Sequence, residues 1–248
     1  MRFYIIALQF LTIIPLPFSV RCEKEDLGRS TALFPLAGLT IGALLVLLDW
    51  LVSPWLARPL CDALLVTALA AITGGLHLDG LADVCDGLAA RGGRERFLAV
   101  MKDSQVGAVG AVGLVLGLLL KWQALVAVAP GLKWQALLLF PVLARFGQVL
   151  ALTGARHARQ DGLGVLFVQG AGLVALSIAF ISALAAGVTL LGFKGIVPLV
   201  AVSLLTAAGR LFFQRRLGGL TGDTIGCISE LNEILALMII SALPQFIF

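Results

Sequence analysis

The chain has 248 residues, of which 60% are hydrophobic and only 13% are charged. A typical soluble domain has about 25% charged residues, so this composition, together with a mean hydropathy of +1.03, excludes an ordinary soluble protein. Apolar runs long enough to cross about 30 Å of hydrocarbon as helices recur along the chain, whereas a membrane barrel would show short alternating segments. The sequence therefore predicts an all-α, polytopic integral membrane protein.

The apolar runs predict a bundle of six or seven transmembrane helices in one domain that covers residues 1–248. The opening segment has Arg2 before an apolar core and Pro15 and Pro17 after it, but no small-residue cleavage site follows. It therefore predicts an uncleaved helix that lies in the membrane interface. The predicted spans lie near residues 32–57, 60–76, 106–129, 133–154, 163–191, 195–214 and 231–248.

The lysines and arginines predict the orientation of the bundle. If the segment before residue 32 is cytoplasmic, thirteen of the 18 basic residues fall on the cytoplasmic side, four fall outside and Arg145 lies within a span. The positive-inside rule then makes 77–105 and 215–230 cytoplasmic loops, and the net charge of +4 indicates no nucleic-acid partner. The thirteen are Arg2, Arg21, Lys24, Arg29, Arg91, Arg94, Arg96, Lys102, Arg156, Arg159, Arg210, Arg215 and Arg216. The four are Arg58, Lys121, Lys133 and Lys194.

An acidic cluster stands in the stretch "GGLHLDGLADVCDG". Asp79, Asp83 and Asp86 are separated by four and three residues, so they share one face of a helix. Three like charges repel one another unless a cation lies among them, and hard carboxylate oxygens suit Mg²⁺ or Mn²⁺. A solvated helix end is the alternative, but three acids on one face favour a metal site.

The residues around this cluster are candidates for substrate binding. Gly80 and Gly87 lower helix propensity and let a bulky phosphate approach the backbone. His77 is either a base or ligand of the site or an amphipathic packing residue at the membrane boundary. Asp49 and Asp62, near the opposite ends of spans, are expected to be interfacial.

The stretch "RGGRERFLAVMKDSQVGAVG" places basic groups close to the carboxylates. Such groups suggest a di- or polyphosphate that is held partly by a metal ion and partly by cations. The positive-inside rule alone would also supply the arginines. Lys102, Asp103 and Ser104 are the stronger candidates, because they abut the next span beside a glycine opening.

A second acidic stretch, "GGLTGDTIGCISELNE", ends at residue 233. Asp223 and Glu230 repeat the seven-residue spacing of Asp79 and Asp86, which predicts that both stretches form one split pocket. Thr221, Gly222 and Asp223 fit a helix cap as well as they fit a substrate site.

Charges and thiols elsewhere give weaker signals. Arg145 is expected to face a polar cavity or partner, because a charge inside a span is costly. The four cysteines form no CxxC pair, and three of them fall on the reducing side, so neither disulfides nor zinc are expected. They are Cys22, Cys61, Cys85 and Cys227.

These three stretches, together with the opening "QFLTIIPLP", resemble the cobalamin synthase family of adenosylcobinamide-GDP ribazoletransferases over residues 8–233. The resemblance implies a multi-pass enzyme of the bacterial inner membrane that requires Mg²⁺ and whose active site faces the cytoplasm. It implies that α-ribazole or its 5′-phosphate is joined to adenosylcobinamide-GDP, with release of GMP. Ile13 and Gln105 depart from the family pattern, so a phosphate contact at these positions is not expected.

The resemblance and the chemistry together assign the site. Asp79, Asp83, Asp86, Asp223 and Glu230 are the predicted catalytic residues, because a metal must neutralise the pyrophosphate and a carboxylate must accept the proton of a ribose hydroxyl. The predicted metal ligands are Asp79, Asp83, Asp86 and Glu230, and the predicted substrate-binding residues are His77, Gly80, Gly87, Lys102, Asp103, Ser104, Thr221 and Gly222.

Parts of the sequence also fit two other functions. The segment "DVCDGLAAR" matches the first half of the CDP-alcohol phosphotransferase signature, but the second half is missing after Arg91. An ion-coupled transporter would place its ionisable residues near the middle of the bilayer. Only Arg145 fits that pattern, so a transferase remains the favoured function.

Overall fold

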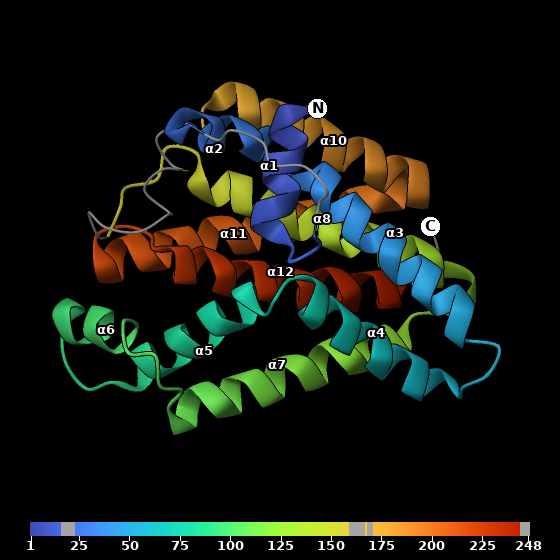
Figure 1. The fold of residues 1–248 in the computed structure, drawn as a ribbon, viewed down its shortest axis with the longest axis horizontal. Helices are drawn as coiled ribbons and strands as arrows, with labels where there is room; N and C mark the ends of the chain where they lie inside the picture. Colours follow the sequence, from blue (N-terminus) through green and yellow to red (C-terminus); the bar gives the residue numbers. More distant parts are fainter. Residues whose placement is uncertain (16–22, 159–166, 168–170, 244–248) are drawn as a thin grey trace.

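The computed structural model describes residues 1–15, 23–158, 167 and 171–243. Arg21, Cys22 and Arg159 lie outside the described residues, as does the start of the span predicted at 163–191. The described part is helical and contains no strand, which confirms the all-α class (Figure 1). Its helices are α1 (Arg2–Leu11), α2 (Lys24–Ser30), η1 (Thr31–Leu33), α3 (Phe34–Val52), α4 (Arg58–Ile72), α5 (Leu76–Ala89), α6 (Arg94–Val100), α7 (Ala108–Ala127), η2 (Pro130–Leu132), α8 (Lys133–Leu152), α10 (Leu173–Leu191), η3 (Gly192–Gly195), α11 (Ile196–Leu217) and α12 (Gly222–Ala242).

Five helical runs in the described residues are long and apolar enough to cross a membrane, or up to six if the bent pair α4–α5 is counted as one span. The longest run, Leu173–Leu217, contains both α10 and α11, joined by η3. The last span begins at Gly222 rather than near residue 231. This arrangement confirms the polytopic bundle that the composition predicts.

The segments expected as cytoplasmic loops are largely helical. Residues 77–105 contain most of α5 and all of α6, and α12 takes up the end of 215–230. The axis turns by 91° between α4 and α5, because Gly74 and Gly75 adopt positive φ angles of 61° and 69° that favour glycine. We call this turn the α4–α5 elbow.

Helix α8 forms the centre of the bundle. Within the apolar span that contains α8, 83% is buried inside the protein. Helix α3 packs closely along α8. A Cβ at Gly38 would lie 2.6 Å from the carbonyl oxygen of Pro141, and one at Gly42 would lie 2.7 Å from that of Leu137. Small residues at these positions let the two backbones approach, as in other membrane helix pairs.

Helix α12 lies between two groups of helices, with α8 and α11 on one side and α5 and α7 on the other (Figure 1). Along α7, Gly110, Gly113 and Gly117 face α5, where an added Cβ would meet Asp86, Cys85 and Leu81 respectively. Because the numbering rises on one helix as it falls on the other, α5 and α7 are antiparallel. This packing holds the acidic face of α5 beside α12.

The N-terminal helix α1 is short, as predicted, and buries Ile6, Ala7 and Leu11 against the bundle. Arg2 forms an ion pair with Asp26 of α2. Its place in the membrane interface remains a prediction.

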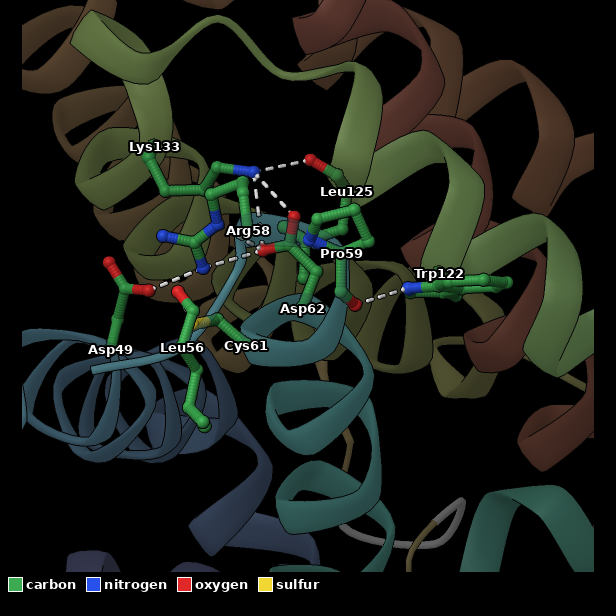
Figure 2. Close-up of polar contacts among 9 residues, drawn as sticks. All are labelled: Asp49, Leu56, Arg58, Pro59, Cys61, Asp62, Trp122, Leu125 and Lys133. Carbon is green, nitrogen blue, oxygen red and sulfur yellow. Dashed lines mark hydrogen bonds and ion pairs between the residues drawn. The ribbon is translucent and has the colours of Figure 1, made fainter. Parts of the chain in front are cut away.

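An ionic cluster joins the ends of α3, α4 and α8 (Figure 2). Asp62 is fully buried and accepts hydrogen bonds from Arg58 at 2.7 Å and from Lys133 at 3.2 Å. Arg58 also contacts Asp49 at 2.5 Å, and Lys133 donates to the carbonyl of Leu125. Asp62 is buried inside the protein because two cations and the helix ends surround it, and its position at the membrane interface stays a prediction.

Candidate active site

The three aspartates of α5 share one helix, as their spacing predicts, but their surroundings differ. Asp79 is exposed, whereas Asp83 and Asp86 are half-buried. The two oxygens of Asp86 accept hydrogen bonds at 2.7 Å from the backbone N–H groups of Gly107 and Gly110. Asp86 therefore caps the N-terminus of α7, where a negative charge is favourable.

Asp223 lies in the first turn of α12, beside this acidic face. A Cβ at Gly80, which lies between Asp79 and Asp83 on α5, would be 2.6 Å from the carbonyl oxygen of Asp223. One turn along α12, a Cβ at Gly226 would lie 3.3 Å from the Cα of His77. The two acidic stretches therefore meet where α5 crosses α12.

Arg94 of α6 ties this end of the bundle together. Its guanidinium donates to the carbonyl of Leu217 at 2.6 Å and to that of Ala158 at 2.7 Å. The backbone of Ala158 in turn donates to Leu220 at 3.0 Å. The two segments that the charge pattern placed on one side of the membrane are thus neighbours in the structure.

Several predicted substrate-binding residues have packing or capping roles. Gly80 makes room for Asp223, and a Cβ at Gly87 would lie 2.6 Å from the ring of Phe97. Protein atoms therefore occupy the space at these glycines where a phosphate was expected to approach. Thr221 forms a capping box with Thr224, accepting its N–H at 3.2 Å, so the cap is the observed role.

The remaining predicted residues lie on the surface near α5. Lys102, Asp103 and Ser104 are exposed between α6 and α7, and Asp103 accepts the N–H of Gln105 at 3.0 Å. Gly222 is exposed in the first turn of α12. These four positions are accessible to a phosphate, as their prediction requires.

Glu230 lies in a different environment from the aspartates. Lys121 of α7 contacts Glu230 at 2.6 Å and Glu233 at 2.5 Å, and Arg145 of α8 pairs with Glu233. All four side chains are buried, and two positive charges balance two negative ones. The sequence grouped Glu230 with the aspartates, but it faces inward because α12 packs this face against α7 and α8, where Lys121 and Arg145 lie.

His77 adjoins this buried charge network. The amide of Gln148 lies 2.7 Å from Nε2 of His77 and 2.9 Å from Oγ of Ser229. Nδ1 of His77 lies 3.5 Å from the guanidinium of Arg145. His77 is only 4% exposed, so it packs inside the bundle rather than facing the predicted substrate.

The predicted metal ligands differ in their surroundings, and the aspartates form no set of three ligand atoms within 4.8 Å among the described residues. His77, Glu230 and Glu233 are the one set of three candidate ligands within 4.8 Å among the described residues. However, Lys121 and Arg145 already neutralise the two glutamates, and a cation there would have to displace Lys121. Asp79, Asp83 and Asp223 supply hard oxygens at the accessible end of the α5–α12 crossing.

Sequence reasoning missed Lys121, Gln148 and Ser229. The charge pattern placed Lys121 on the outer side, as an exception to the positive-inside rule. This exception was the available sign that Lys121 has a buried partner. Gln148 and Ser229 are uncharged, and their partnership with His77 depends on how three helices pack. Arg145 meets its expectation, because Glu233 is its buried partner.

The fold and this site define a polytopic helical membrane protein with a carboxylate face where two helices cross at one end of the bundle. A family model described as cobalamin-5-phosphate synthase matches residues 3–241. The chain belongs to this family.

Curated relatives match over nearly their full lengths and are named adenosylcobinamide-GDP ribazoletransferase. The protein of Geotalea daltonii is 60% identical over 243 residues, 98% of each chain. That of Clostridium tetani is 31% identical, over 97% of this chain and 96% of its own. That of Caldanaerobacter subterraneus is 34% identical, over 96% and 97%. No solved structure shows a significant match.

Proposed function

We propose that this protein is an adenosylcobinamide-GDP ribazoletransferase, which joins adenosylcobinamide-GDP to α-ribazole or its 5′-phosphate and releases GMP. The observation that carries the proposal is the 60% identity to a protein of that name over 98% of both chains. The family match over residues 3–241 leaves no large part of the chain outside the resemblance.

Release of GMP fixes the bonds that change. A ribose hydroxyl of the acceptor attacks the phosphorus attached to the corrinoid, and the bond from that phosphorus to the bridging oxygen breaks. The corrinoid keeps one phosphate, which now joins it to the ribose, and GMP leaves with the bridging oxygen. The hydroxyl proton passes to a base, and a carboxylate of the α5–α12 crossing is the group available for it.

Asp79, Asp83 and Asp223 are the residues that would hold Mg²⁺. When bound, Mg²⁺ neutralises the pyrophosphate charge that otherwise opposes attack. Asp86 can share this role and also positions α7, because each of its oxygens accepts one backbone N–H at the N-terminus of α7 and keeps a second lone pair. It thereby fixes where the exposed Lys102–Ser104 segment stands relative to α5, and Lys102 supplies a positive charge for the diphosphate.

We also propose that the protein resides in the bacterial inner membrane with the α5–α12 crossing on the cytoplasmic side. The excess of arginine and lysine at that end supports this orientation.

The proposal is tested by incubating the purified protein with adenosylcobinamide-GDP, α-ribazole and Mg²⁺. We expect GMP and a ribazole-containing corrinoid to form in equal amounts. Hydrolysis of the GDP derivative without joining, or the absence of both products from folded protein, would refute the proposed activity.

A further inference from the structure

A cleft of about 590 Å³ opens between the end of α1, the α4–α5 elbow and α7. In Figure 1, α1 ends above this elbow. The volume is within the range of about 300–1,000 Å³ that is typical of small-molecule pockets. Its walls are mainly apolar and include Phe10, Ile13, Leu76, Leu78, Leu114 and Leu118.

The elbow fixes the shape of this cleft. The backbone of Ile13 donates to the carbonyl of Ile72 at 2.9 Å, which attaches the segment after α1 to the end of α4. A Cβ at Gly74 would lie 2.6 Å from Cγ2 of Ile13. The left-handed glycine therefore allows the closest approach between the two walls.

The cleft is continuous with the acidic face of α5. Asp79 forms part of its wall and is the one charged side chain in the described lining. The next acid on that face, Asp83, lies one helical turn away. A ligand in the cleft would thus have an apolar body in contact with leucine and phenylalanine and a polar end close to the carboxylates.

We propose that this cleft binds the base of the acceptor nucleoside and directs its ribose toward Asp79. The inference rests on the proposed function, which requires an acceptor with a flat, apolar aromatic base and a polar ribose. The other substrate carries a corrin macrocycle with many amide side chains and is several times bulkier. Size and polarity therefore assign the cleft to the nucleoside, and the corrinoid diphosphate approaches the carboxylates from outside it.

The test compares two tryptophan substitutions on α7. Leu114 lines the cleft, whereas Leu116 is 55% exposed and does not line it. We expect Leu114→Trp to raise the KM for α-ribazole by about tenfold or more, because the larger side chain fills part of the apolar pocket and a steric misfit there costs about 10–200-fold. The KM for adenosylcobinamide-GDP should change less than about twofold, and Leu116→Trp should change neither.

Two further measurements keep the outcome decisive. Equilibrium binding of radiolabelled α-ribazole should weaken in parallel in Leu114→Trp, and α-ribazole 5′-phosphate should be affected by a similar factor, because both share the base. If the tryptophan variant fails to fold, Leu114→Ala, which removes volume instead of adding it, takes its place in the same measurements.

Each contrary result identifies what failed. A wild-type protein without turnover would refute the proposed function itself. An active wild type whose Leu114 variants raise the KM of the corrinoid, or alter neither KM, would overturn the cleft assignment alone. Retention of a lipid in the purified cleft that α-ribazole does not displace would also overturn it.

Discussion

At the scale of single residues, Asp86 shows that the acids of one cluster can have different roles. Asp79, Asp83 and Asp86 share one face of α5, and Asp86 accepts hydrogen bonds from two backbone N–H groups at the start of α7. Glycines at 107 and 110 are required there, because an added Cβ would run into the carboxylate. A helix cap and the proposed reaction site therefore use neighbouring residues of the same motif.

Replacing Asp86 by Asn should lower the stability of the protein. The amide retains one acceptor oxygen, so one of the two backbone N–H groups loses its partner and the charge at the helix N-terminus disappears. We expect a loss of about 1–2 kcal/mol, seen as a lower midpoint of thermal unfolding in detergent. Asp79→Asn, on the exposed turn, is the matched control and should leave the midpoint unchanged. Equal midpoints for both variants would contradict the capping role.

At the scale of helices, the buried network joins α7, α8 and α12 through Lys121, Arg145, Glu230 and Glu233. Such a network is costly to desolvate, but it is costlier to break, because an unpaired charge then remains in the bundle. It therefore fixes the rotation of α12, and with it the position of Asp223 beside α5.

Replacing Lys121 by Met should destabilise the bundle by about 3–5 kcal/mol, since two glutamates then remain buried without their shared partner. The double variant Lys121→Met, Glu230→Gln should be more stable than the sum of the two single losses predicts. Thermal unfolding of the three variants measures this coupling. Additive losses would show that Lys121 and Glu230 do not interact as the structure describes.

The helices themselves could be predicted from the sequence, because apolar length determines where a chain crosses a bilayer. The one-sided acidic face of α5 also followed from its spacing, and Arg145 was recognised as needing a buried partner. The inward turn of Glu230 could not be predicted, since its seven-residue distance from Asp223 is the same for an exposed and a buried side chain. Only the packing of α12 against α7 and α8 decides between them. The elbow at Gly74 and Gly75 could not be predicted either, because two glycines in the sequence do not specify a turn; in the structure they turn the helix axis through 91° and bound the cleft.

At the scale of the whole molecule, a different set of charged residues links the helices at each end of the bundle. Arg94 links α6 to the segments after α8 and α11, whereas the cluster of Asp49, Arg58, Asp62 and Lys133 closes the other end (Figure 2). The positive-inside rule assigns the first end to the cytoplasm.

Single cysteines should report this orientation. Cysteines introduced at Glu95 and Arg216, both exposed, should be labelled by an impermeant thiol reagent only after the cells are opened. A cysteine at Trp55, which is 83% exposed between α3 and α4, should be labelled on intact cells. Labelling of the first two positions on intact cells would reverse the proposed orientation.

We propose that the transfer occurs at the accessible carboxylates of the α5–α12 crossing, while the buried network only supports them. A magnesium titration of the initial rate tests it most directly, with wild type, Asp83→Asn and Glu230→Gln measured side by side. We expect Asp83→Asn to insert and fold normally but to lose at least about 10²-fold in rate at every Mg²⁺ concentration, whereas Glu230→Gln, although less stable, keeps the wild-type half-saturating concentration. A wild-type rate in Asp83→Asn, or a raised magnesium requirement in Glu230→Gln, would contradict the account and move the metal toward the buried glutamates.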